Sequence, residues 1–256
     1  LHDGVPQLRL ESEWTPPTNP EFNPPSKANH SSLLMRMLTR PNIASKETWV
    51  RKYDHEVIAQ TAVKPFVGVE RDGPGDAGLL APIHGSTHGL VVSNGISPRY
   101  SDIDAGAMAA AVDEAVRNAV CTGVDLSKIA GLDNFCWPDP IESKKTPDGK
   151  FKLAQLVRAN RELERICRAY FVPCISGKDS MKNDYGTGEN KISIPPTLLF
   201  SLFGNHHDVR YTTTSDLKPG ESLYLVGESK QELGASEISY MLSESGESNG
   251  IGGEVP

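Results

Sequence analysis

The chain has 256 residues, of which 38% are hydrophobic and 23% are charged, and its formal net charge is −7 at pH 7. This acidic balance lacks the basic surface that nucleic-acid binding requires, so we expect no nucleic-acid partner. No apolar run approaches the roughly 20 residues that cross a bilayer, and we expect no membrane partner.

The two ends of the sequence and its cysteines indicate a cytoplasmic excerpt of a longer chain. Leu1 stands where a methionine would begin a complete chain, no signal segment follows it, and residues 250–256 resemble a loop. The four cysteines form no C-x-x-C pair, which argues against a zinc site and against a disulfide framework. We expect buried thiols in a reducing cytoplasm.

Short elements are predicted before residue 100. Five prolines between residues 16 and 25 predict an extended linker. Ser31 or Ser32 is predicted to cap a helix over 33–39, and another short helix is predicted over 45–53. Strands are predicted over 56–69 with an interruption at Pro65, over 77–81, and over 89–93, where Asn94-Gly95 reads as the closing turn.

The strongest helix pattern covers residues 104–123, with Asp104 as the predicted cap and Gly123 as the predicted end. A step of about 100° per residue puts Glu114 and Asn118 together at the rim of its apolar stripe, whereas Asp113 faces water. A carboxylate and an amide oxygen one turn apart can share a hard cation. The alternative is an ordinary solvated helix edge.

A second cluster of polar residues, after Glu114 and Asn118, follows the apolar run that begins at Val172. A strand over 128–134 and a helix over 152–170 lead to the segment 172–180, where a strand stops at Gly177 and presents Lys178, Asp179 and Ser180. An ammonium, a carboxylate and a hydroxyl together suit phosphate with Mg²⁺. This is not a Walker A loop, and a polar turn that closes a strand is the alternative.

The pattern after residue 190 completes the fold prediction. A strand over 192–203 contains Pro195-Pro196, which predicts an edge or a bulge; a new strand begins at 222–226, and a helix is possible over 231–242. Early strands followed by a β-α-β-α-β order predict an α+β fold with a mixed sheet backed by helices.

Six motifs in order carry a resemblance: RPNIASK (40–46), YDHEV (53–57), SPRYSD (97–102), DEAVRN (113–118), DNFCWP (133–138) and SGKDS (176–180). As a set they resemble the synthetase subunit of phosphoribosylformylglycinamidine synthase, over nearly all of residues 1–242. The resemblance implies an aminoimidazole ribonucleotide synthetase-like fold. It assigns residues 1–53 to the end of a B domain and a linker, 54–208 to an ATP-binding A domain, and 209–256 to the start of a C-terminal B domain.

The same resemblance implies a function. The family is an ATP-dependent ligase that converts formylglycinamide ribonucleotide and ammonia drawn from glutamine into formylglycinamidine ribonucleotide, through an iminophosphate, in purine biosynthesis. Its implied cofactors are ATP and Mg²⁺, and its implied partners are a glutaminase and small accessory subunits or domains. Two alternatives are a half of the same enzyme that holds nucleotide without turnover, and another ATP-dependent member of the superfamily, such as a thiamine-phosphate kinase-like enzyme.

Site residues follow from the resemblance position by position. Metal ligands correspond to Asp76, Glu114, Asn118 and Asp179, and contacts to ATP and substrate correspond to Gly177 and Ser180. From the residues themselves we add Lys178 for its ammonium and Asp133 as a nucleotide contact. We also add Arg99, just past a strand end, as a contact to phosphate or a base, with an ordinary surface loop residue as the alternative. Lys178 and Asp179 follow the long single-chain relatives, because the short subunits have Asn and Val there. An aspartate of the relatives is replaced by Gly131, with Asp133 nearby. No catalytic residue is assigned, because the matching histidine belongs to the first A domain. His55 reads as structural, and an A domain without its partner is expected to self-associate.

Overall fold

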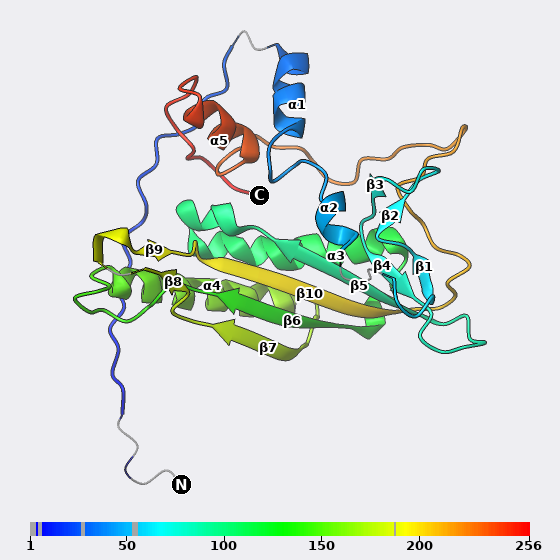
Figure 1. Ribbon diagram of the computed structural model, residues 1–256, viewed down its shortest axis with the longest axis horizontal. Helices are drawn as coiled ribbons and strands as arrows, with labels where there is room; N and C mark the ends of the chain where they lie inside the picture. Colours follow the sequence, from blue (N-terminus) through cyan, green and yellow to red (C-terminus); the bar gives the residue numbers. More distant parts are fainter. Residues whose placement is uncertain (1–3, 5–6, 27–28, 53–55, 187) are drawn as a thin grey trace.

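The computed structural model describes residues 4, 7–26, 29–52, 56–186 and 188–256. Its centre is a six-stranded sheet in the order β1 (Thr61–Val63), β4 (Gly78–Leu80), β5 (Gly89–Ile96), β10 (Thr197–His206), β6 (Ile129–Cys136) and β7 (Cys174–Ser180). The pair of β6 and β7 is parallel and the other pairs are antiparallel. The predicted mixed sheet backed by helices is therefore confirmed (Figure 1).

Helices α3 (Ala110–Thr122) and α4 (Gly149–Ala169) cover one face of this sheet (Figure 1). The buried side of α3 is alanine-rich, which lets its backbone approach the sheet closely. Both predicted ends of the helical pattern are confirmed. Asp104 accepts a 2.8 Å hydrogen bond from the Gly106 amide, and Gly123 closes α3 with a φ of 95°. The first turn differs from the prediction, because it is the 3₁₀ helix η2 (Ala105–Ala109).

The remaining elements are short and surround the sheet. They are α1 (His30–Leu38), α2 (Glu47–Val50), β2 (Phe66–Val67), β3 (Gly73–Pro74), η1 (Pro98–Asp102), η3 (Leu126–Lys128), β8 (Asp184–Tyr185), η4 (Gly188–Asn190), β9 (Ile192–Ser193) and α5 (Glu237–Glu244). The strand predicted over 56–69 is divided into β1 and β2, with Pro65 between them. His55 lies outside the described residues.

The turn predicted at Asn94-Gly95 is wrong, because β5 continues through both residues to Ile96. Asn94 pairs with Ser201 and Gly95 with Phe200 in the antiparallel ladder to β10. Gly95 is needed for packing: a Cβ there would lie 2.0 Å from the carbonyl oxygen of Ala111 on α3. A dipeptide that is typical of hairpin turns here permits close contact between a helix and a strand.

Three further predictions are corrected. Asn29 caps α1, where its side chain accepts a 3.0 Å hydrogen bond from the Ser32 amide; neither predicted serine is the cap. Pro195-Pro196 precede β10, which is a central strand between β5 and β6 and is neither an edge nor a bulge at the prolines. No strand forms at residues 222–226, where Leu223 is 78% exposed. The apolar pattern there has no neighbouring strand with which to pair.

The two terminal segments pack against each other beside the sheet (Figure 1). Phe22 shares a small apolar core with Met241 and Leu242 of α5. Arg40 forms ion pairs with Glu237 and, at 2.8 Å, with Glu244. The segments that we assigned to different domains thus share a core, and the domain boundaries remain a prediction.

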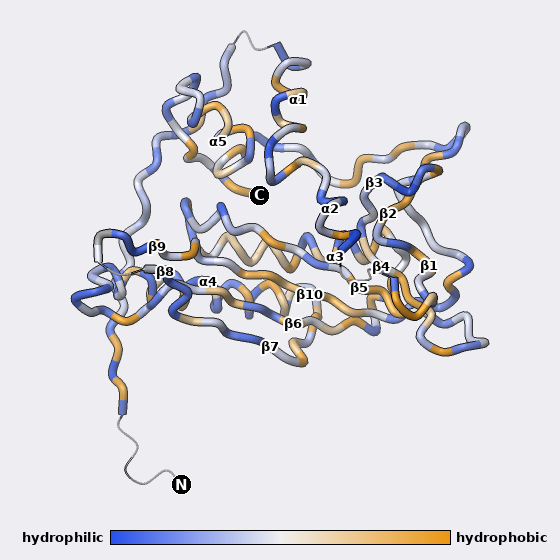
Figure 2. The backbone as a smooth tube through the Cα atoms, viewed as in Figure 1, coloured by the Kyte–Doolittle hydropathy of each residue, from blue (hydrophilic) through white to orange (hydrophobic). Residues whose placement is uncertain are grey.

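The sheet face opposite α3 and α4 carries half-buried apolar side chains from four strands. Figure 2 shows hydrophobic stretches along β5, β10 and β6. Strand alternation and pairing place these side chains on one face: Leu80, Leu90, Val92, Leu132, Leu199 and Phe203. The outer edge of β7 adds an exposed strand, since six of its seven residues are exposed. Such a face and such an edge are typical of a contact surface.

The cap at Asp104 generates a stability prediction. Burial opposes ionisation of this carboxyl, but the Arg158 guanidinium and the Gly106 amide lower its pKa below 3.8. Replacing Asp104 by Ala should cost about 1 kcal/mol of folding free energy at pH 7, or roughly 2–4 °C in Tm. The ionised carboxylate is stabilising, so the difference in Tm should shrink as the pH falls below 3.8 and Asp104 protonates. Asp72→Ala, at an exposed position, is the control, and an Asp104→Ala deficit that is unchanged at pH 3 would contradict this account.

The open face generates a second prediction. We expect the chain to form a two-fold dimer through this face at high micromolar concentration, measured by light scattering. Leu199→Lys, which puts a charge at the centre of the face, should shift the mass toward the monomer, since burying an unpaired ammonium is costly. Val120→Lys, at a 48% exposed position on α3, should leave the dimer intact. A strictly monomeric unsubstituted chain would refute the prediction.

Candidate functional site

The first part of the site is the free edge of β5. Because β4 pairs only as far as Val92, the later residues of β5 have no strand neighbour on that side. Helix α3 supplies the missing partners: Glu114 Oε2 accepts from the Ile96 amide at 2.8 Å, and Asn118 Nδ2 donates to the Asn94 carbonyl at 3.0 Å. The predicted adjacency of Glu114 and Asn118 at the rim of the buried stripe agrees with this arrangement. One oxygen of each side chain remains free of these bonds.

Asp76 reaches the same edge from the segment that leads into β4. Together with Lys64 and Asn94 it lines a hollow of about 230 Å³. Its side chain is exposed and makes no hydrogen bond or ion pair with the described residues. Lys64 forms an ion pair with Glu56.

The free oxygens at this edge suit a hard cation. Asp76, Glu114 and Asn118 each offer an oxygen, which is the ligand type that Mg²⁺ prefers. Among the described residues, no group of three His, Cys, Asp or Glu side chains could hold a metal ion by itself. Mg²⁺ commonly retains waters and binds phosphate oxygens in addition to one or two carboxylates. The donors therefore fit part of a metal–phosphate site and do not fit a closed metal cage.

Asp179 does not join these three residues. It lies on β7, which is separated from β5 by β10 and β6, a distance of about 14 Å across three strand spacings. It pairs with Phe135, a core residue, so its side chain starts toward the face covered by α3 and α4. The predicted convergence of four metal ligands is therefore absent from the described chain by itself.

Strand β7 divides the predicted phosphate motif between the two faces of the sheet. We predicted that the strand stops at Gly177, but it continues to Ser180 because its pairing with β6 extends to Cys136. Lys178 and Ser180 lie on the open face, where the Lys178 ammonium donates to the Ser180 hydroxyl. Both line a hollow of about 570 Å³ with Asp184 of the β8 strand. Gly177 and Asp179 lie on the helix-covered face.

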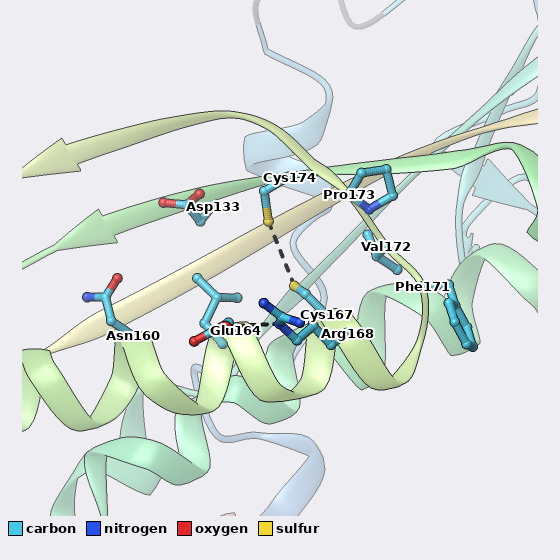
Figure 3. A pocket seen from close by; sticks show the side chains of 10 residues that line it. Asp133, Asn160, Glu164, Cys167, Arg168, Phe171, Val172, Pro173 and Cys174 are labelled. Atoms are coloured by element: carbon cyan, nitrogen blue, oxygen red, sulfur yellow. Dashed lines mark hydrogen bonds and ion pairs between the residues drawn. The ribbon is translucent and has the colours of Figure 1, made fainter.

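Asp133 faces Gly177 on the neighbouring strand. A Cβ at Gly177 would lie 2.7 Å from Asp133 Oδ1, so the glycine makes room for this carboxylate. Burial raises the pKa of Asp133, and the Asp179 carboxylate raises it further. Asp133 also lines a cavity of about 840 Å³ together with Cys167 and Cys174 (Figure 3). Gly131 cannot supply the aspartate of the relatives, because a Cβ there would lie 2.2 Å from the Phe200 ring.

Arg99 is engaged with α5. Its guanidinium carbon lies 3.8 Å from the centre of the Tyr240 ring, and its Nε lies 3.4 Å from Glu237. These contacts hold the terminal segments against the sheet. They also occupy much of the cationic group that we predicted for a phosphate or a base.

Asn94 was missed by the sequence analysis. Its carbonyl accepts from Asn118, its Oδ1 accepts a 2.7 Å hydrogen bond from the Ser201 hydroxyl, and it lines the hollow with Asp76. It therefore connects two predicted ligand segments. The Asn94-Gly95 dipeptide could have drawn attention to this position, but we interpreted it as a turn and therefore did not consider Asn94 as a site residue.

Comparison with known proteins relates the chain to one family of enzyme subunits. No protein-family model matches the chain. The subunit PurL of phosphoribosylformylglycinamidine synthase from Thermus thermophilus is 35% identical over 223 residues, which are 86% of this chain and 28% of that subunit. The PurL subunit from Alkaliphilus metalliredigens is 32% identical over 264 residues, 96% of this chain and 32% of that subunit.

One solved structure supports the fold. Thermotoga maritima PurL complexed with ADP has a TM-score of 0.53 and 21% sequence identity, over 80% of this chain and 28% of that one. The chain spans about three tenths of the length of the curated relatives it matches. No described helix is long and apolar enough to cross a membrane. Over most of its length the chain is thus homologous to part of the PurL subunits of phosphoribosylformylglycinamidine synthase and shares their fold, which confirms the resemblance drawn from its six motifs.

Proposed function

We propose that the chain is a nucleotide-binding part of a phosphoribosylformylglycinamidine synthase. Homology to PurL subunits supports the family, and a relative with this fold has been solved with ADP. The observation that carries the site is that Asp76 lines a hollow with Asn94, while Glu114 and Asn118 bond to the backbone of Ile96 and Asn94 at the same free edge of β5. We assign these three residues to the Mg²⁺ and phosphates of a bound nucleotide. Mg²⁺, when bound, neutralises phosphate charge there.

The residues of β7 have a separate role in this proposal. Lys178 and Ser180 offer a cation and a hydroxyl on the open face, which suit phosphate oxygens of nucleotide or of substrate. Asp179 and Asp133 lie on the other face, where a further metal ion would relieve the repulsion between their carboxylates. Gly177 allows Asp133 to approach the strand.

In the whole enzyme, ATP would phosphorylate the amide oxygen of formylglycinamide ribonucleotide, and ammonia would displace phosphate from the iminophosphate. We propose that a glutaminase and small accessory subunits supply the ammonia and that the assembly works in the cytoplasm. The work of this chain would be to bind and orient phosphates, because it offers carboxylates, an amide and a lysine at two strand edges.

A second candidate is a nucleotide-holding scaffold of the same enzyme. The placement of Asp179 on β7, which three strands separate from β4 beside Asp76, favours it, since the described residues do not gather the four predicted ligands around one nucleotide. The two candidates differ in whether bound nucleotide exchanges. A nucleotide that survives purification and does not exchange with added labelled ADP favours the scaffold.

The metal assignment predicts a selective loss of ligand stabilisation. With ADP and Mg²⁺ at about 100 times Kd, the chain should gain about 2.7 kcal/mol of stability, or roughly 5–10 °C in Tm. Asp76→Asn should lose most of that gain and leave the ligand-free Tm unchanged, because the side chain is exposed and has no partner among the described residues.

The matched control for Asp76 is Asp72→Asn, an exposed aspartate four residues earlier that does not line the hollow. It should retain the full gain. Asp113 is unsuitable as a control, since it pairs with Arg117 and accepts a hydrogen bond from the Tyr170 hydroxyl, and is not turned simply toward water as predicted. Equal behaviour of the two asparagine variants would refute the metal assignment.

The share of the enzyme that the chain represents predicts its lack of turnover. Supplied with ATP, Mg²⁺, ammonia and formylglycinamide ribonucleotide, the pure chain should give no formylglycinamidine ribonucleotide in a chromatographic assay. The reason is that the chain matches only 28% of such a subunit, and the resemblance assigns the catalytic histidine to the first A domain, outside this chain. Product that depends on both ATP and ammonia would overturn this prediction.

A further inference from the structure

Two cysteines outside the proposed nucleotide site lie against each other in the cavity of Figure 3. The Sγ atoms of Cys167 and Cys174 are 3.8 Å apart. Cys167 belongs to the last turn of α4, and Cys174 is the first residue of β7. The other two cysteines, Cys121 and Cys136, lie on α3 and β6. We propose that Cys167 and Cys174 are a reversible dithiol–disulfide pair, which a small disulfide such as oxidised glutathione cross-links and a small thiol reopens.

The backbone on both sides of this pair is fixed in a suitable position. The Val172 amide donates to the Cys167 carbonyl at 2.9 Å, which ends the helix tightly. On the strand side, the Gly131 amide donates to the Pro173 carbonyl at 2.9 Å and Gly131 pairs with Cys174. Closing the two sulfur atoms to a bond of about 2.05 Å therefore requires side-chain rotation and only small movement of the chain.

The two thiols differ in access, which assigns their roles. Cys174 is exposed, whereas Cys167 is 8% exposed. Cys174 as the thiolate would attack one sulfur of the small disulfide and release one small thiolate. Cys167 as the thiolate would then attack the Cys174 sulfur of the mixed disulfide and release the second. Two protein thiols and one small disulfide thus become one protein disulfide and two small thiols, so the two electrons pass to the small disulfide.

The surroundings of the pair make the reaction slow at neutral pH. Burial raises the pKa of Cys167 to about 12 and raises that of Cys174 as well. The charged groups that line the cavity are Asp133 on β6 and Glu164 and Arg168 on α4. Below the thiol pKa the thiolate fraction grows tenfold per pH unit, so cross-linking should be about a hundredfold faster at pH 9 than at pH 7.

The cross-link would act on an otherwise weakly held strand. β7 is bound to β6 on one side, and six of its seven residues are exposed. A disulfide would tie its first residue to the end of α4 and restrict the local opening of residues 174–180. That segment contains Gly177, Lys178 and Ser180, so oxidation would stiffen a strand of the proposed phosphate site. The chemistry of the pair does not depend on that proposal.

The test is peptide mapping of the full chain after incubation with oxidised glutathione at pH 7 and pH 9. We expect a peptide pair linked through Cys167 and Cys174, faster formation at pH 9, and reversal by reduced glutathione. Hydrogen exchange of residues 174–180 should slow at least several-fold in the oxidised chain, while that of β10 stays unchanged. Cys174→Ser should abolish the link, and Cys121→Ser, which removes an exposed thiol on α3, should preserve it.

Two results would overturn the proposal. One is a stable mixed disulfide with glutathione at Cys174 that never resolves onto Cys167. The other is modification of Cys121 alone, with Cys167 and Cys174 still free after prolonged incubation at pH 9. Neither result would bear on the nucleotide site, which the Asp76 and Asp72 variants test separately.

Discussion

The contact between α3 and β5 is the constraint on which the site depends. Gly95 allows the Ala111 carbonyl to approach the strand, and Ser93 donates to the Ala115 carbonyl at 2.7 Å inside the core. This close approach brings Glu114 and Asn118 within hydrogen-bond distance of the free edge of β5. A larger residue at position 95 would push α3 away from β5 and break the hydrogen bonds of Glu114 and Asn118 to the strand. The edge that β4 leaves open is thereby satisfied by side chains, whose remaining oxygens are free for a ligand.

The geometry and order of the strands determine on which face and at which edge of the sheet each polar side chain lies. Alternate residues of β7 point to opposite faces, so Lys178 and Asp179 are neighbours in sequence and serve different surfaces. The strand order places β7 at the far edge from β4, which separates Asp179 from Asp76. A ligand that engaged both would have to bridge the sheet or involve another surface brought beside it. The half-buried apolar face and the exposed edge of β7 are where such a surface could pack.

The terminal segments add a second constraint, which acts through charge and aromatic contact. Arg40 and Arg99 both reach Glu237, and Tyr240 lies under the Arg99 guanidinium. Burial of Glu237 opposes its ionisation, but Asn42 and the two arginines lower its pKa, so it stays charged at neutral pH. Partly buried pairs of this kind orient α5 more than they add stability. Arg99, which we predicted as a contact to phosphate or a base, thus connects η1 to α5 in this structure.

The sequence by itself determined the local features: the helix between Asp104 and Gly123, the adjacency of Glu114 and Asn118, the α+β class, and the motif set that relates the chain to PurL. Each depends on contacts within a few residues, where the helical period and capping chemistry are decisive. Only the tertiary structure decided that Asn94 lies in a strand, that three strands separate β7 with Asp179 from β4 beside Asp76, and that Cys167 meets Cys174. Strand order and close approach between elements depend on contacts between distant residues, and local spacing carries no information about them.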